Sequence, residues 1–134
     1  MTKRILLAIL SVFVAWSVMD FLIHGVLLQP IYGETAHMWR PMEEMNMRMM
    51  YLVSLISASA FVLIYVSLTT NRSVKLGILY GLLFGLANGI SAGFGTYSVM
   101  PIPITLAWGW FLGIIAEAAV AGAITGAIVK PNAS

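Results

Sequence analysis

Four long apolar stretches, separated by short segments rich in polar residues and proline, dominate the pattern along this chain. A helix needs about 20 predominantly apolar residues to cross a hydrocarbon core of about 30 Å. Each stretch has roughly this length, and together they account for most of the chain. The pattern therefore predicts an all-α integral membrane four-helix bundle, a single transmembrane domain over residues 1–134 with spans at about 5–28, 47–69, 76–99 and 104–129.

The composition agrees with a bilayer as the solvent, because 60% of the 134 residues are hydrophobic and only 9% are charged. The N-terminal apolar run is too long for a signal-peptide core and contains Asp20 and His24, so we expect it to be retained as the first span. The absence of cysteine excludes disulfides, thiolate metal sites and cysteine catalysis. Basic residues lie at the span ends and form no patch, so no nucleic-acid partner is expected.

The distribution of charge predicts how the spans are oriented. Lysine and arginine accumulate on the cytoplasmic side of membrane proteins, and five of the seven would share one side if the chain crosses four times. We therefore expect both termini in the cytoplasm of a bacterial cell, with the protein in the inner membrane and a short extracytoplasmic segment between the first two spans. The five cations are Lys3, Arg4, Arg72, Lys75 and Lys130, and the opposite side carries Arg40 and Arg48 with Glu34, Glu43 and Glu44.

Prolines and polar turns mark the connections between the spans. The first span should end near Gln29-Pro30, because proline removes a backbone donor and disfavours helix in the preceding residue. Pro41 suits the first position of the second helix, with acidic residues in its first turn. The turn at residues 69–73 and the connection at residues 100–103 are short, so the helices that they join should be antiparallel neighbours.

A stripe of small residues runs along the third span. Residues spaced by four lie nearly above one another on a helix, so glycines at this spacing form a groove in which another helix can pack closely. The fourth span carries a corresponding stripe through Gly109 and Gly113. We expect the third span to contact either the fourth span or a second protomer, and the protein to form a homo-oligomer or part of a larger membrane complex. The glycines of the third span are Gly77, Gly81, Gly85, Gly89 and Gly93.

Asp20 and Glu117 lie deep within otherwise apolar spans. A carboxylate at the centre of a bilayer costs about 2.5 to 3.5 kcal/mol on insertion scales, so both should face protein or water. At about 1.5 Å of rise per residue, Ser57 and Asn88 fall at a similar depth. We therefore predict a buried polar site of Asp20, His24, Ser57, Asn88 and Glu117, either a proton- or cation-responsive site or a polar contact between helices.

Asp20 and His24 are four residues apart and share one helical face, where the pair would titrate near neutral pH. His24 would lie near the outer surface, and Glu34 and His37 form a Glu-x-x-His unit in the following segment. Histidine, carboxylate and nearby methionines are possible metal ligands. A single Glu-x-x-His does not make a diiron site, however, and a methionine stripe is more often packing. Metal is therefore possible at His24, Glu34 and His37, and no cofactor is required.

The segment Asp20 to Leu28, the aromatic Tyr32, Trp39-Arg40-Pro41 and the terminal Lys130-Pro131 resemble those of uncharacterised small four-helix bacterial inner-membrane proteins. This resemblance implies a polar and aromatic outer loop but no activity. The size and buried acids are also similar to those of small multidrug-resistance transporters. Those proteins carry a glutamate in the first span, whereas this chain has Asp20 there and Glu117 in its last span, so no functional residue is carried over.

Three functions remain open on the sequence. The first is a non-catalytic membrane subunit or binding protein that packs through its glycine-rich helices and contains a buried polar site. The second is a homo-oligomeric proton- or cation-coupled transporter or channel that uses Glu117 and Asp20. The third is a membrane metal-binding protein centred on His24 and His37. No catalytic motif is present, so an enzyme is not expected.

Overall fold

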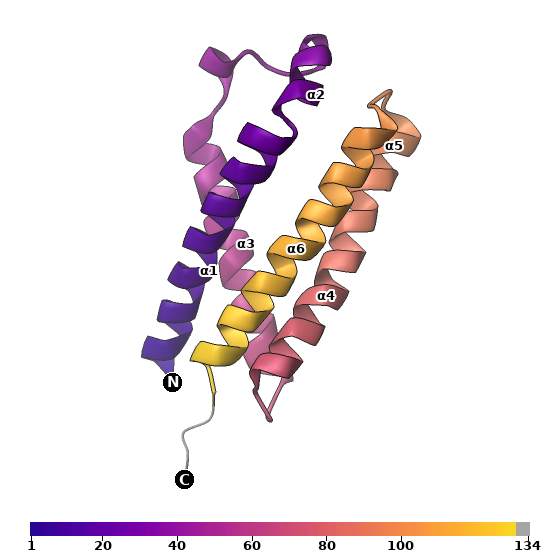
Figure 1. Cartoon of the computed structure of the whole chain (residues 1–134). Helices are drawn as coiled ribbons and strands as arrows, with labels where there is room; N and C mark the ends of the chain where they lie inside the picture. Colours follow the sequence, from indigo (N-terminus) through magenta and orange to yellow (C-terminus); the bar gives the residue numbers. More distant parts are fainter. Residues whose placement is uncertain (131–134) are drawn as a thin grey trace.

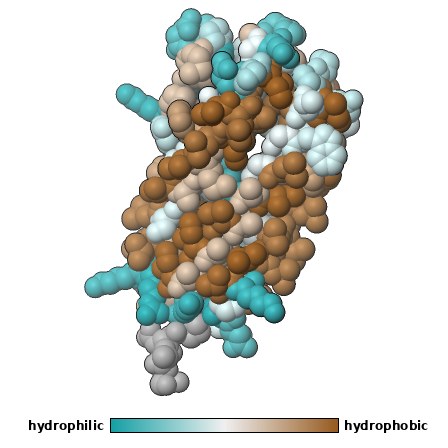
Figure 2. Space-filling model, in the orientation of Figure 1, coloured by the Kyte–Doolittle hydropathy of each residue, from teal (hydrophilic) through white to brown (hydrophobic). Residues whose placement is uncertain are grey.

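The computed structural model describes residues 1–130, and within this range it is helical and contains no strands (Figure 1). Four helical spans are long and apolar enough to cross a membrane, as predicted. Figure 2 shows a largely hydrophobic surface over the middle of the molecule and hydrophilic residues at both ends. The helices are α1 (Thr2–Leu22), α2 (Gln29–Glu34), α3 (Met47–Leu68), α4 (Val74–Ile90), α5 (Thr96–Val99) and α6 (Ile104–Ile128), and π-type turns at Ile23–Leu27 and Ser91–Gly95 extend α1 and α4.

The structure corrects the expected start of the second helix at Pro41, whereas the second span begins at Met47, as predicted. Pro41 has an extended backbone, with φ −54° and ψ 150°, and Met42–Glu44 form a separate short turn. The long helix α3 begins at Met47, because the side chain of Asn46 accepts a hydrogen bond from the backbone N–H of Met49 and so satisfies a free donor of the first turn.

The two ends of the molecule carry different connections. The N-terminus, the α3–α4 loop and the C-terminal end of α6 lie together at one end, whereas α2 and the segment after it lie at the other (Figure 1). Arg4 Nη1 donates to the carbonyl of Lys130 at 2.7 Å, and Arg72 Nη1 contacts the sulfur of Met1. Pro131, the last residue of the Lys-Pro motif, lies outside the described residues. The five cations at residues 3, 4, 72, 75 and 130 therefore share one end.

Helices α4 and α6 pack with their backbones in contact along the glycine stripe. A Cβ added at Gly77 or Gly81 would collide with a backbone carbonyl of α6, and one at Gly85 would lie 2.8 Å from Ile115 Cα. The reciprocal face of α6 consists of Ala118, Gly122 and Gly126. Gly109 and Gly113, which the sequence pattern placed on this face, contact the end of the first span instead. The glycine stripe of the third span is therefore filled by a helix of the same chain.

Aromatic rings separate α3 from α4. The ring centroid of Phe61 lies 4.6 Å from that of Tyr80 and 5.0 Å from that of Phe84. Tyr80 donates its hydroxyl proton to the carbonyl of Phe61 at 2.9 Å, and Tyr65 donates to that of Ser73 at 3.0 Å. Because both hydroxyls donate to backbone carbonyls, the rings can fill the centre of the bundle without leaving polar groups unpaired.

The main apolar core occupies the half of the bundle that contains the two termini. Its members on α1 precede Asp20, and its members on α6 follow Glu117. Among the described residues of this half, the buried hydroxyl of Thr125 is bonded to the carbonyl of Ala121. This terminal-side core consists of Ala8, Val12, Ala58, Phe61, Val62, Tyr65, Ala118, Ala121 and Val129.

Candidate functional site

The end of the first span holds Asp20 and His24 on one face, as their spacing predicted. His24 Nε2 lies 3.9 Å from Asp20 Oδ1, and both side chains are about half-exposed, at 41% and 49%. Immediately after them the helix widens into the π-type turn, in which the N–H of Leu28 bonds the carbonyl of Ile23, five residues back. Such turns recur at functional sites, since they insert one residue and rotate the next part of the helix about its axis. Here the turn leads from the Asp20–His24 face into α2.

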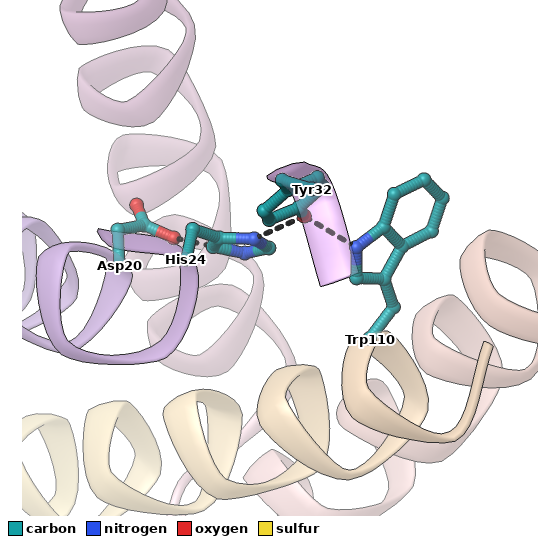
Figure 3. A network of polar contacts seen from close by, with 4 residues as sticks. All are labelled: Asp20, His24, Tyr32 and Trp110. Carbon is teal, nitrogen blue, oxygen red and sulfur yellow. Dashed lines mark hydrogen bonds and ion pairs between the residues drawn. The ribbon is translucent and has the colours of Figure 1, made fainter. Parts of the chain in front are cut away.

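Tyr32 joins His24 to α6 through two short hydrogen bonds (Figure 3). The Tyr32 hydroxyl lies 2.7 Å from His24 Nδ1, and Trp110 Nε1 donates to the same hydroxyl at 2.7 Å. Tyr32 comes from α2 and Trp110 comes from α6, and the two residues are 78 positions apart in the sequence. These hydrogen bonds link His24, Tyr32 and Trp110, and Asp20 lies 3.9 Å from the other ring nitrogen of His24; we call these four residues the relay.

Local contacts of α2 fix the position of Tyr32. Thr35 is buried, donates to the carbonyl of Ile31 and accepts a hydrogen bond from the indole of Trp39 at 2.9 Å. The Trp39 ring then packs edge-on against Tyr32 and Trp110, with centroids 5.5 and 6.1 Å away. Burial among these rings raises the pKa of Tyr32, so its phenol keeps its proton at neutral pH and can donate it in a hydrogen bond.

Glu117 approaches the same face of α1 from α6. The indole of Trp16 donates to the backbone carbonyl of Glu117 at 2.9 Å, which holds the two helices together at this level. The Glu117 carboxyl lies close enough to Asp20 for the two charges to interact. Its Oε1 atom is buried and has no hydrogen-bond partner. Two acids, one with an unsatisfied buried oxygen, therefore meet at the inner end of the relay.

Two glycines of α6 make room for this approach. A Cβ at Gly109 would lie 2.6 Å from the side chain of Leu28, and one at Gly113 would lie 3.3 Å from Ile23. Leu28 is only 7% exposed and packs with Ile102, Leu106 and Ala107 in a second apolar cluster. The predicted packing role of Gly109 and Gly113 therefore lies at the α1–α6 contact that carries the site.

Ser57 and Asn88, which were expected in the buried polar site, lie outside it. Both side chains are exposed on the outer surface of the bundle, and the Asn88 amide donates to the carbonyl of Phe84 on its own helix. Depth along a helix does not determine the direction in which a residue faces, and these two face away from the acids. One turn before Ser57, the hydroxyl of Ser54 is buried without a partner.

The residues suggested as metal ligands are not brought together. Glu34 and His37 are exposed, and His24 Nδ1 is occupied by Tyr32. Within residues 1–130 no group of three histidine or acidic side chains has the proximity that a metal ion needs. The structure therefore gives no support to the metal-binding alternative.

Tyr32, Trp110 and Trp16 are the site residues whose roles sequence reasoning missed. Their polar atoms contact groups that are distant in sequence, and indole and phenol side chains near span ends are common for reasons of membrane anchoring alone. The partner of Trp16 is a backbone carbonyl, which no side-chain pattern reveals. Only the conspicuous cluster of aromatic residues after Leu28 could have drawn attention to this segment.

Comparison of the chain with protein-family models, curated proteins and solved structures finds no significant match. The acids and the relay are therefore the basis for assigning a function.

Proposed function

We propose that this protein is a non-catalytic membrane protein of the bacterial inner membrane that binds protons from one side, at the Asp20–Glu117 acid pair. The buried, unpartnered Oε1 of Glu117 beside Asp20 carries the proposal. Two carboxylates that are close together repel one another when both are ionised, and a buried oxygen on one of them adds to this cost, so such a pair favours sharing a proton. The acids therefore form a proton-binding site.

Access to this pair is one-sided. The relay leads from Asp20 toward the end that carries α2. On the other side of the acids, the terminal-side core is filled by apolar and internally bonded aromatic side chains. With the termini in the cytoplasm, as the five cations at that end favour, the site takes its proton from the extracytoplasmic side.

A binding or regulatory subunit fits this arrangement better than a channel. A conducting pathway needs polar groups or water on both sides of the acids, whereas the terminal-side core is mainly apolar and the hydroxyls in and beside it are bonded to backbone carbonyls. The glycine stripes do not supply a docking surface for a partner, because they are already packed against other helices of this chain. Any partner would therefore contact the α2 end or the large apolar side chains that face lipid.

Glu117→Gln tests proton binding, since it keeps the size of the side chain and removes its acid. Infrared difference spectroscopy between neutral and acidic buffer should detect, in the wild type, a carboxyl band that appears on acidification. We expect Glu117→Gln to abolish this band. The matched control is Glu34→Gln, which removes an exposed acid and should leave the band intact. A band of full size in Glu117→Gln protein would overturn the proposal.

A measurement of proton flux distinguishes the subunit hypothesis from the transporter hypothesis. In liposomes with an imposed pH gradient, the wild type should leak no faster than empty vesicles. A flux that is lost in Glu117→Gln protein would establish proton-coupled transport and would overturn the one-sided site.

A further inference from the structure

We propose that a proton binding to His24 reverses the hydrogen bond between His24 and Tyr32, and that Trp110, which donates to the same Tyr32 oxygen, reports this change. This inference rests on the proton-binding function proposed above and names the element that responds. The relay of Figure 3 contains the groups concerned.

The direction of the hydrogen bonds in the relay follows from Trp110. An indole N–H can only donate, so the oxygen of Tyr32 must accept from Trp110. The hydroxyl proton of Tyr32 is then free to be donated to His24 Nδ1, 2.7 Å away. A nitrogen that accepts this proton carries none itself. We assign the single proton of the neutral ring to Nε2, because this atom faces the Asp20 carboxyl and the assignment leaves Nδ1 to accept from Tyr32.

A second proton on His24 reverses the first of these contacts. Both ring nitrogens of the imidazolium are donors, so Nδ1 can no longer accept from Tyr32. The tyrosine oxygen has two lone pairs, so it can accept from both Trp110 and the imidazolium, but its own proton must turn away from His24. The imidazolium is also attracted to the Asp20 carboxylate, whose Oδ1 lies 3.9 Å from Nε2. Protonation therefore reverses the direction of the His24–Tyr32 hydrogen bond and strengthens the Asp20 contact.

The surroundings of His24 contain few competing charges. From α1 the Asp20 carboxyl faces it, and from α2 the Tyr32 phenol does. The Glu117 carboxyl on α6 acts on Asp20. Tyr32 remains held by Trp39 and Trp110 through ring packing. The rearrangement is therefore local, and the hydroxyl proton of Tyr32 reorients within a fixed aromatic cluster.

The indole N–H signals of the tryptophans test this switch by NMR on ¹⁵N-labelled full-length protein in nanodiscs. Between about pH 8 and about pH 5, the range that includes ordinary histidine titration, the Trp110 signal should shift along the same curve as the His24 ring nitrogens. Trp39 is an internal control, because its indole bonds Thr35 and not Tyr32, and its signal should stay nearly constant. Tyr32→Phe should reduce the Trp110 shift to near zero.

The possible outcomes are distinguishable. A Trp110 signal that stays constant while His24 titrates, or that shifts as much in Tyr32→Phe protein as in the wild type, would overturn the switch. A His24 ring that does not titrate in this range would overturn it as well. The infrared experiment reads the acid pair directly, so loss of the switch with an intact carboxyl band leaves the proposed function standing. Absence of that band removes the proposed function whatever His24 does.

Discussion

Replacing Gly81 with alanine should destabilise the protein severely, although the change adds a single methyl group. The new Cβ would collide with the backbone carbonyl of Ala118 on α6. A backbone carbonyl cannot turn aside as a flexible side chain can, so α4 and α6 would have to separate along their shared face. Overpacking typically costs 1 to 3 kcal/mol, and we expect a loss of about 3 kcal/mol or more in the free energy of unfolding.

Reversible unfolding in mixed micelles measures this loss, and the same span contains a matched control. A Cβ at Gly95 would lie 3.8 Å from its nearest neighbour, the Ser91 hydroxyl, which is ordinary contact. Gly95→Ala should therefore leave the unfolding free energy nearly unchanged. Equal stability of the two variants would show that α4 and α6 are not in backbone contact.

Phe61→Ala should produce the second large effect, a loss of about 3 to 5 kcal/mol in the free energy of unfolding. Phe61 is fully buried and packs edge-on against Trp16, whose indole holds the backbone of Glu117. It also packs against two rings of α4. Truncation leaves a cavity that Trp16, Tyr80 and Phe84 cannot fill without giving up their own contacts.

Leu63→Ala is the control for Phe61→Ala. Leu63 lies on the same helix and is 47% exposed, so its truncation should change the unfolding free energy by only about 0.5 kcal/mol. If Phe61→Ala cost no more than Leu63→Ala, the terminal-side core would not be the close-packed barrier on which the one-sided site depends.

The spans and their approximate bounds could be predicted because hydrophobic length is a direct physical requirement of the bilayer. The glycine stripe could also be predicted, because a repeat of four residues is visible in the sequence without knowledge of the helix that packs against it. It left two partners open, α6 or a second protomer, and the structure selects α6. The matching face of α6 could not be assigned, because that helix is apolar all round and carries small residues on more than one side.

The candidate site was predicted only where the signal is local. Asp20 and His24 are separated by one helical turn, so their proximity follows from helix geometry. Ser57 and Asn88 were placed by depth alone, which leaves rotation about the helix axis undetermined. The start of α3 was misplaced because Pro41 and the acidic residues after it fit a helix N-terminus, while Asn46 supplies the side-chain cap. Trp110 depends on a contact across 78 residues, which a single sequence does not encode visibly.

The pairing of α1 with α6 has a consequence for how the protein is made. Asp20 and His24 are synthesised in the first helix, whereas Glu117 and Trp110 arrive in the last. Helices α4 and α6 can close early on one another, because the connection between α5 and α6 is short and costs little chain entropy. The acid pair and the relay therefore cannot form until the last helix has been inserted into the membrane and has packed against the first.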